Sequence, residues 1–164
     1  MKKHSSIAVI LIALIALITF SCNQTIQNPL TLEERAAIED TIKQLALVVE
    51  NAANNVDLDA SFDLFSDDPD FTFSEDGFIL PPKDSLYKMM KPLYDNWSKI
   101  LMKYETMRVT VLDRNSGVFT GEGPWSATDL SGNEYGGHLV SMFVFANRNG
   151  EWKMIHGHTS HTFN

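Results

Sequence analysis

The spacing of apolar residues predicts one long helix at the start of the folded part of the chain. Between residues 31 and 56, apolar side chains recur at helical intervals; they are Ile38, Ile42, Leu45, Val49 and Val56. Thr31 is followed three residues later by Glu34, the spacing of a capping box in which each side chain satisfies a backbone N–H. We therefore expect an amphipathic helix from Thr31 to about Asn54.

Helical spacing continues in two further segments, with a short alternating stretch between them. The second helix carries Leu58, Phe62 and Phe65 and should end at Asp68, because Pro69 disfavours helical backbone in the residue before it. Phe71 to Phe73 alternates as a strand, and Ser74 to Gly77 should form a turn. A third helical stripe contains Pro92, which either kinks the helix or starts a new one; its apolar members are Leu86, Met89, Met90, Leu93, Trp97, Ile100 and Leu101.

After residue 104 the period changes from that of a helix to that of a strand. Alternation predicts strands at Glu105–Asp113, Val118–Thr128, Glu134–Asn147 and Glu151–His161. Asn149-Gly150 lies between the last two strands and is typical of a tight hairpin, because both residues tolerate positive φ. Helices followed by successive antiparallel strands indicate an α+β fold in which the helices pack on one face of a sheet.

The first residues have the pattern of an export signal. Lys2 and Lys3 precede an aliphatic run from Ile7 to Ile18, and Ser21 is small enough for a cleavage site. The run is too short to span a bilayer comfortably, since a spanning helix needs about 20 apolar residues. We therefore expect residues 1–21 to be a cleaved leader, residues 22–30 to be a tether and residues 31–164 to be one domain.

Cys22 is the only cysteine in the chain and directly follows the leader. A lone cysteine in an exported protein forms an intermolecular disulfide, stays a free thiol or is modified. Thr19 to Cys22 resembles a lipobox, at which bacterial lipoproteins are lipidated on the cysteine and cut before it. This resemblance implies a lipoprotein of the bacterial envelope, anchored to a membrane and facing the periplasm; an ordinary signal peptide cut nearby is the alternative.

The charge balance excludes one class of partner. The chain has a net charge of −8, and loss of Lys2 and Lys3 with the leader makes it −10. Such a surface repels nucleic acid, and no basic cluster reverses this locally.

A run of acids from Asp57 to Asp76 does not match the calcium-binding loop of an EF-hand. Phe62 and Asp68 stand at the positions where that loop requires glycine and glutamate.

The last hairpin carries a family resemblance. Asn149-Gly150-Glu151-Trp152-Lys153-Met154-Ile155-His156-Gly157-His158-Thr159-Ser160 resembles the final strand of SnoaL-like proteins in the NTF2-like superfamily, and the order of predicted elements over residues 31–161 agrees more loosely. The resemblance implies an NTF2-like cone, in which N-terminal helices pack on a curved antiparallel sheet and enclose an apolar pocket. Different members use this pocket for catalysis, ligand binding or assembly, so the fold does not choose among them.

Strand parity supplies the candidate pocket residues. Side chains two apart on a strand share a face, so His156 and His158 should lie on the face of Trp152 and Met154. The full set of predicted pocket-lining residues is His156, His158, Trp152, Met154, His138, Trp125, Trp97 and Tyr94. In a pocket the two histidines could act as acid, base or oxyanion donor. The sequence favours the alternative, in which they are hydrogen-bonded core histidines or simply orient the end of the strand, because it assigns them no acidic partner.

Other candidate sites are weaker. His156 and His158 have a spacing at which one strand offers two nitrogens to zinc, with His161 or His138 as a third ligand; His161 has the opposite parity, and we expect no metal or cofactor. Pocket carboxylates and hydroxyls could support isomerase or cyclase chemistry. The candidates for that role, none of which stands at a recognisable motif, are Asp70, Glu122, Tyr87 and Tyr94.

The function predicted from the sequence is binding of a small apolar or amphipathic molecule by a lipid-anchored envelope protein. One alternative is a pocket enzyme of isomerase, cyclase or dehydratase type that uses His156 or His158. Another is an assembly module with a vestigial pocket. We also expect a homodimer formed through the outer face of the sheet, because the strand Glu134–Asn147 has large apolar residues on both faces, for example Met142 and Phe143.

Overall fold

The computed structural model describes residues 28–163, so the predicted leader, Cys22 and most of the tether lie outside the described residues. The helices are α2 (Leu32–Asn54), α3 (Leu58–Asp63) and α4 (Lys83–Asp95). The strands are β1 (Thr72–Glu75), β2 (Phe78–Ile79), β3 (Trp97–Met102), β4 (Thr106–Asp113), β5 (Ser116–Asp129), β6 (Glu134–Arg148) and β7 (Glu151–Phe163). None of the described helices has the length and apolar character needed to cross a bilayer.

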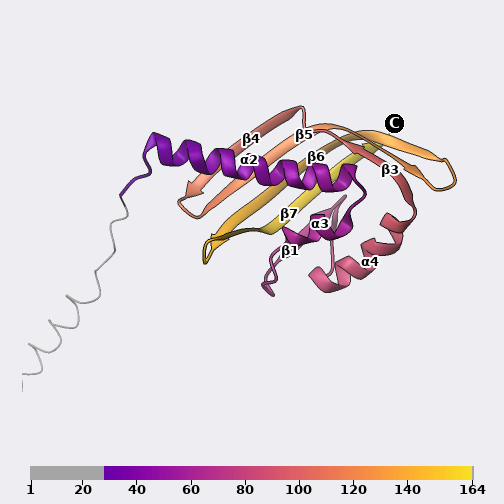
Figure 1. Cartoon of the computed structure of the whole chain (residues 1–164), viewed down its shortest axis with the longest axis horizontal. Helices are drawn as coiled ribbons and strands as arrows, with labels where there is room; N and C mark the ends of the chain where they lie inside the picture. The colour runs from indigo at the N-terminus through magenta and orange to yellow at the C-terminus, as the bar shows by residue number, and fades with distance from the viewer. Residues whose placement is uncertain (1–27, 164) are drawn as a thin grey trace, which may run out of the picture.

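Helix α2 begins where the sequence predicts. Thr31 Oγ1 accepts a hydrogen bond from the backbone N–H of Glu34 at 3.1 Å, and Glu34 Oε2 accepts one from the N–H of Thr31 at 2.8 Å. The capping box is therefore confirmed. Ile42 and Ala46 are fully buried, and Ile42 packs against Gly117 of β5. Figure 1 shows α2 lying across the strands of the sheet. Burial of this apolar face stabilises the helix more than its intrinsic propensity does.

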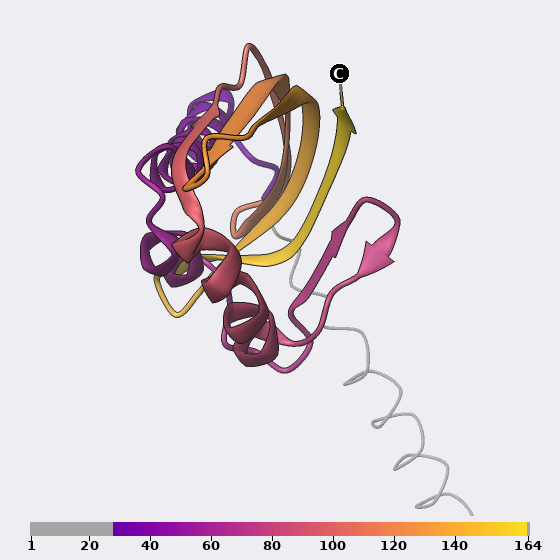
Figure 2. The ribbon, with the colours of Figure 1, turned by 90° about the vertical axis from the view of Figure 1, so that its right-hand side faces the viewer.

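The strands form one curved sheet in the order β2-β1-β7-β6-β5-β3, with β4 also paired to β5. All pairs are antiparallel except β1 with β7, which run parallel. This parallel pair departs from the expected all-antiparallel sheet. After the β1–β2 hairpin, α4 carries the chain to the opposite edge of the sheet, where it continues as β3. In Figure 2 the strands curve around an inner side on which the helices lie.

The third predicted helix is shorter than its apolar stripe. Helix α4 ends at Asp95, and the residues from Trp97 to Met102 form strand β3 instead of a continuing helix. These residues pair with β5, from Trp97 opposite Asp129 to Met102 opposite Trp125. The prediction of helix up to Leu101 is therefore wrong. The short run of apolar residues after Asp95 fits the spacing of a helix or of a strand, and hydrogen bonding to β5 selects the strand.

The second predicted helix also ends early. Helix α3 stops at Asp63, five residues before the expected end at Asp68. The next residues bind the backbone of β7: Leu64 accepts a hydrogen bond from the N–H of Met154 at 2.7 Å, and Ser66 donates one to its carbonyl at 2.9 Å. This bridge to a distant strand replaces the helical hydrogen bonds that residues 64–68 would have made.

Strand β7 contains an irregularity that decides which of its side chains face the helices. Its pairing with β6 shifts register, so that Phe145 lies opposite Met154 and Val144 lies opposite His156. Ile155 is thus one extra residue, a β-bulge, which reverses the alternation beyond it. The predicted tight hairpin before this strand is confirmed, since Asn149 and Gly150 have φ of 58° and 88°.

The corner between β3 and β4 is fixed by two side chains of α2. Asn54 binds both backbone groups of Met102, donating to its carbonyl at 2.9 Å and accepting from its N–H at 2.6 Å. Glu50 Oε2 accepts a hydrogen bond from the N–H of Tyr104 at 2.6 Å. These contacts position Met102 and Tyr104 over the inner face of the sheet, next to the cavity described below.

Candidate functional site

A cavity of 490 Å³ lies between the three described helices and the inner face of the sheet. Its size is typical of small-molecule sites. Aliphatic and aromatic side chains make up most of its wall: α2 contributes Val49, α3 contributes Phe62, and α4 contributes Met90 and Tyr94. Trp97 of β3, residues of β1 and the turn after it, and several residues of β5 to β7 also line the cavity. The wall therefore favours an apolar occupant.

Polar side chains cross the sheet side of this cavity in a single row. Ser141 of β6 lies opposite Thr159 of β7, and Thr159 lies beside Glu75 of β1. At the other end of the row, the ring of Tyr104 lies over Gly121 of β5. We call Tyr104, Ser141, Thr159 and Glu75 the polar row. Ser141 and Thr159 are buried, and their hydroxyl oxygens are 3.4 Å apart.

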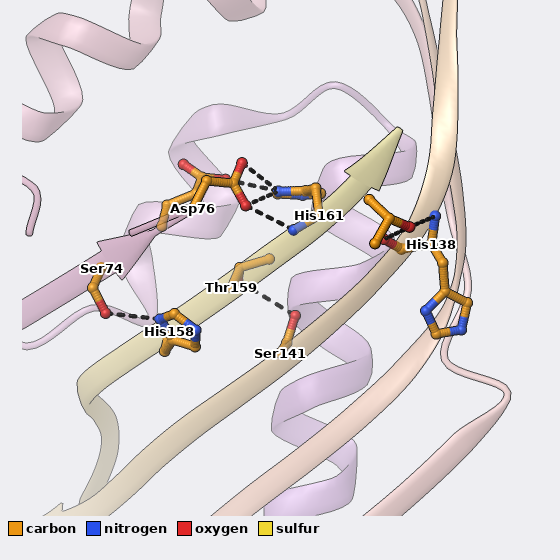
Figure 3. A network of polar contacts seen from close by, with 9 residues as sticks. Ser74, Asp76, His138, Ser141, His158, Thr159 and His161 are labelled. Carbon is orange, nitrogen blue, oxygen red and sulfur yellow. Dashed lines mark hydrogen bonds and ion pairs between the residues drawn. The ribbon is translucent and has the colours of Figure 1, made fainter. Parts of the chain in front are cut away.

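The bulge in β7 brings His161 into the cavity wall, where Asp76 holds it. Asp76 Oδ1 accepts a hydrogen bond from the backbone N–H of His161 at 2.7 Å, and its Oδ2 lies 3.1 Å from the ring Nδ1 (Figure 3). Because an ionised carboxylate can only accept, Nδ1 carries the proton. The other ring nitrogen, Nε2, makes no hydrogen bond with the described residues, so it is available to a molecule in the cavity.

Glu75 is the member of the polar row that lies beside the His161–Asp76 pair. Its Oε1 is 3.7 Å from His161 Nδ1. Burial raises the pKa of the Glu75 carboxyl; His161 opposes this rise, Asp76 adds to it and His158 opposes it. A carboxyl with a raised pKa is protonated more readily at neutral pH, so Glu75 can donate or accept a proton.

Four of the eight predicted pocket residues line the cavity. Tyr94, Trp97, Trp125 and Met154 all contribute to its wall. They come from α4, β3, β5 and β7, so the fold gathers them from separate elements around one space. Trp125 also packs edge-to-face against His161, with ring centroids 5.0 Å apart.

The other four predicted residues are not part of the wall. His156 and His158 lie on the outer face of the sheet, because the bulge at Ile155 reverses their parity relative to Met154. His158 Nδ1 lies 2.9 Å from Ser74 Oγ, a contact visible in Figure 3. Their prediction as cavity residues is therefore wrong.

His138 and Trp152 also lie away from the cavity. His138 is exposed on the outer face of β6, opposite Thr162. Trp152 packs against the core near the Asn149–Gly150 turn, beyond the end of the cavity. Neither residue could contact a molecule bound beside Glu75.

The weaker candidates for acid/base chemistry are also dispersed. Asp70 and Glu122 are exposed, and Glu122 lies on the outer face of the sheet. The Tyr87 hydroxyl donates to Asp59 at 2.6 Å, outside the cavity. Among residues 28–163, no three histidine, cysteine or acidic side chains are placed to hold a metal ion together.

The sequence interpretation missed Glu75 and Asp76 and gave His161 no role except as a third metal ligand. Glu75 and Asp76 belong to the run of acids from Asp57 to Asp76, which the sequence analysis considered only as a calcium-binding loop and rejected. A usable signal existed in the parity of β7, since His161 stands on the opposite face to His156 and His158. The parallel pairing of β1 with β7, which joins the three residues, has no signature in the sequence.

The comparisons with known proteins agree on the family and the fold. A model of the SnoaL-like domain matches residues 38–164. No curated protein sequence matches the chain.

Among solved structures, a putative scytalone dehydratase from Novosphingobium aromaticivorans is similar with a TM-score of 0.72 and 9% identity, covering 80% of this chain and 89% of that one. An NTF2-like superfamily protein from Salmonella enterica has a TM-score of 0.69 and 16% identity, covering 77% and 92%. A hexachlorocyclohexane dehydrochlorinase from Novosphingobium barchaimii has a TM-score of 0.69 and 12% identity, covering 82% and 93%. At these identities the similarity shows the fold alone.

Proposed function

The chain belongs to the SnoaL-like domain family, and we propose that its cavity binds one small, largely apolar molecule whose polar group meets Glu75 and His161. The observation that carries this proposal is the cavity itself: 490 Å³ of space with an apolar wall and polar groups on one side. A vestigial pocket would be filled by its own side chains. The lipobox-like sequence at Cys22 supports the further proposal that the domain works at the surface of a bacterial membrane.

Native mass spectrometry of the protein purified from its own envelope tests the binding proposal. We expect a bound mass on the unsubstituted protein and its loss in Ala127→Phe, because Ala127 is a buried wall residue and the larger ring would occupy the cavity. Leu130→Phe is the matched control, since Leu130 is 69% exposed and outside the wall. Absence of any adduct, together with no response of tryptophan fluorescence to the bicyclic hydrocarbon tetralin, would contradict the proposal.

A second candidate function, acid/base catalysis in the same cavity, is favoured by the His161–Asp76 pair. An imidazole whose Nδ1–H is held by a carboxylate presents Nε2 as a base, an arrangement common in enzymes. Glu75, with its raised pKa, supplies a second proton-transfer group beside it. Two structurally similar proteins are named a dehydratase and a dehydrochlorinase, and both names describe eliminations, which need proton removal. In this chain His161 takes the role that the sequence assigned to His156 or His158.

Proton transfer can be tested without knowing the substrate. If Nε2 of His161 removes a proton from carbon next to a carbonyl, the protein in D₂O will speed exchange of the α-hydrogens of 2-tetralone for deuterium, followed by NMR. We expect His161→Gln and Glu75→Gln to slow this exchange by about 100-fold and Tyr87→Phe to leave it unchanged. Exchange no faster than in buffer would remove the catalytic candidate and leave the binding proposal standing.

The outer face of the sheet supports the proposal of a homodimer. Val140 and Met142 of β6 are 38% and 44% exposed on this face. Arg108 of β4 and Glu122 of β5 lie on the same face, and neither forms an ion pair within residues 28–163. A second copy of this face offers apolar contact at its centre and opposite charges at its rim, so it is the partner that we propose.

A further inference from the structure

Two leucines are exposed to solvent at the end of the domain where the tether begins. Leu32, the first residue of α2, is 87% exposed, and Leu112, near the end of β4, is 57% exposed. Arg35, one turn along α2 from Leu32, donates a hydrogen bond to the carbonyl of Val111 at 3.2 Å. Figure 1 shows that α2 begins and β4 ends at the same end of the domain. We call Leu32, Arg35 and Leu112 the leucine end.

The point at which the tether leaves the domain is fixed beside these residues. Arg114, in the turn after β4, donates a hydrogen bond to the carbonyl of Asn28 at 2.8 Å and forms an ion pair with Glu34 of α2. Cys22 lies six positions before Asn28, and six extended residues reach at most about 20 Å. A lipid on Cys22 would therefore hold the leucine end close to the bilayer surface.

The side chains of the leucine end match the headgroup region of a phospholipid bilayer. Leu32 and Leu112 offer apolar groups that are removed from water when they enter this region. The guanidinium of Arg35 makes one hydrogen bond and no ion pair within residues 28–163, so its other donors are available to phosphate oxygens. Glu33 and Asp113 are exposed nearby, so the contact does not depend on anionic lipid.

A contact made by so few residues is sufficient only for a protein that is already anchored. Two leucines would not hold a free protein on a membrane. A short flexible linker makes the second contact intramolecular, at an effective concentration of about millimolar, so a weak contact is still formed. The leucine end therefore has to orient the domain and does not have to recruit it.

The other strongly exposed apolar pair lies elsewhere in the domain. Phe78 and Ile79, 72% and 82% exposed, belong to the β1–β2 hairpin, whose turn binds His161. His161 lies opposite Leu139, towards the start of β6. The leucine end lies instead beside the turn between β4 and β5, where Ser116 pairs with the end of β6. The tether therefore favours the leucine end over the hairpin as the membrane contact.

We infer that the leucine end rests on the membrane surface, with Leu32 and Leu112 in the headgroup region of a phospholipid bilayer. The inference rests on the anchor in the proposed function and goes beyond it, because a lipid on a flexible tether holds a domain near a membrane without orienting it. The residues of α2 that line the cavity, Val49 and Ala53, begin about 25 Å along the helix from Leu32. This orientation places the cavity towards the far end of the domain from the contact.

Quenching of a fluorescent label by lipid-borne nitroxides tests the inference on the full processed chain in phosphatidylcholine vesicles. Cys22 is the only cysteine, so once it is lipidated an introduced cysteine is the only free thiol for a bimane label. The near reporter is Asn115→Cys in the turn before β5, and the far reporter is Ser131→Cys in the turn after it; both positions are exposed. The 14 residues of β5 separate them by about 45 Å along the strand. We expect nitroxides near the headgroup to quench the near reporter severalfold more strongly.

Substitution of the leucines tests their part in the contact. Leu32→Ser combined with Leu112→Ser should lower quenching of the near reporter to the level of the far one, while the lipid keeps the protein on the vesicles. Leu93→Ser combined with Leu130→Ser is the matched control, because these leucines are 51% and 69% exposed in α4 and in the turn between β5 and β6. The control should leave quenching unchanged. The two reporters with all leucines present decide the orientation even if a substituted protein does not fold.

The outcomes separate the orientation from the anchor. A processed chain that does not bind the vesicles overturns the anchor and the inference together. A chain that binds them with equal quenching of the two reporters, or with quenching unaffected by Leu32→Ser and Leu112→Ser, overturns the inference alone. Stronger quenching of a label at Ile79→Cys than at Asn115→Cys would place the contact on the β1–β2 hairpin. If the leucine substitutions lower the mass by light scattering and leave quenching unchanged, the leucine end meets a second copy, which also overturns the inference.

Discussion

Asp76, at the turn between β1 and β2, accepts hydrogen bonds from both the backbone N–H and the ring of His161 at the far end of β7. The two residues are 85 positions apart in the chain. One carboxylate thus joins the hairpin to the sheet and fixes the orientation of the imidazole in the cavity wall. The attachment of the β1–β2 hairpin and the orientation of the proposed catalytic imidazole therefore depend on the same carboxylate.

Two substitutions of Asp76 should separate the contribution of its hydrogen bonds to stability from the contribution of its backbone conformation. Asp76 has a φ of 48°, a left-handed conformation that asparagine tolerates and alanine does not. We expect Asp76→Ala to lower the free energy of unfolding by about 2 kcal/mol, through lost hydrogen bonds and backbone strain, and Asp76→Asn to lose less than half of that. Urea unfolding measures both. Equal losses in the two variants would show that backbone conformation contributes nothing.

Glu75 should make stability depend on pH in a direction opposite to most carboxylates. Because its pKa is raised in the folded protein, folding favours the protonated form. Its contribution is fully present below the unfolded pKa of 4.5 and is lost as the pH rises through the folded pKa. We therefore expect Glu75→Gln to be more stable than the unsubstituted protein at pH 7 and equal to it at pH 4. Urea midpoints at the two pH values test this; a gain of the same size at both would mean that titration is not the cause.

The sequence predicts the helices, the strands and the family for identifiable reasons. The capping box at Thr31 and the Asn149–Gly150 turn are local signals, and both are confirmed. The family match over residues 38–164 and the solved structures bear out the NTF2-like α+β cone, which the residues of the last hairpin had indicated. Local sequence signals and a family motif are thus enough to predict most of the fold.

The site was harder to predict because it depends on two non-local features. The bulge at Ile155 arises from pairing with β6, and it moves His156 and His158 to the outer face and His161 to the inner one. The parallel pairing of β1 with β7 places Glu75 beside Thr159. Strict two-residue parity cannot anticipate an extra residue, so the predicted histidines were the wrong ones while the aromatic wall residues Trp97 and Trp125 were correct.

Gly123 is required at the corner that carries Tyr104. A Cβ at this position would collide with the backbone carbonyl of Lys103, and backbone cannot move aside as a side chain could. We expect Gly123→Ala to destabilise the domain by about 3 kcal/mol, measured by urea unfolding. Ser126→Ala, three residues along β5 at an exposed position, is the control and should change stability by less than about 0.5 kcal/mol. A mild effect of Gly123→Ala would mean that the corner is not closely packed in solution.

Cys22 decides whether the domain is attached to a membrane. It lies outside the described residues, so this prediction rests on the sequence alone. If Cys22 is lipidated, its acyl chains hold the protein in the membrane fraction, since each buried methylene contributes about 0.8 kcal/mol. Cys22→Ala should then appear in the soluble fraction after cell fractionation. A folded Cys22→Ala protein that still sediments with membranes would contradict the anchor, and unchanged far-UV circular dichroism provides the check on folding.

The final prediction concerns the outer face of the sheet. The sequence alone could not say which face of β6 is covered, and the structure shows that Phe143 is buried against the helices whereas Met142 is 44% exposed. Burial of Val140 and Met142 in a two-fold interface would remove them from water, and an isologous interface brings each residue close to its own copy. Met142→Glu would therefore place two like charges near each other in an apolar contact.

We expect the chain from Asn23 onward to be a dimer at tens of micromolar by light scattering, and Met142→Glu to shift it to a monomer. Leu130→Glu is the matched control, because Leu130 is equally apolar and 69% exposed but lies in the turn between β5 and β6, beyond the face. It should leave the dimer intact. A monomer mass for the unsubstituted protein would overturn the interface, and a dimer that persists in Met142→Glu would place the contact on another surface.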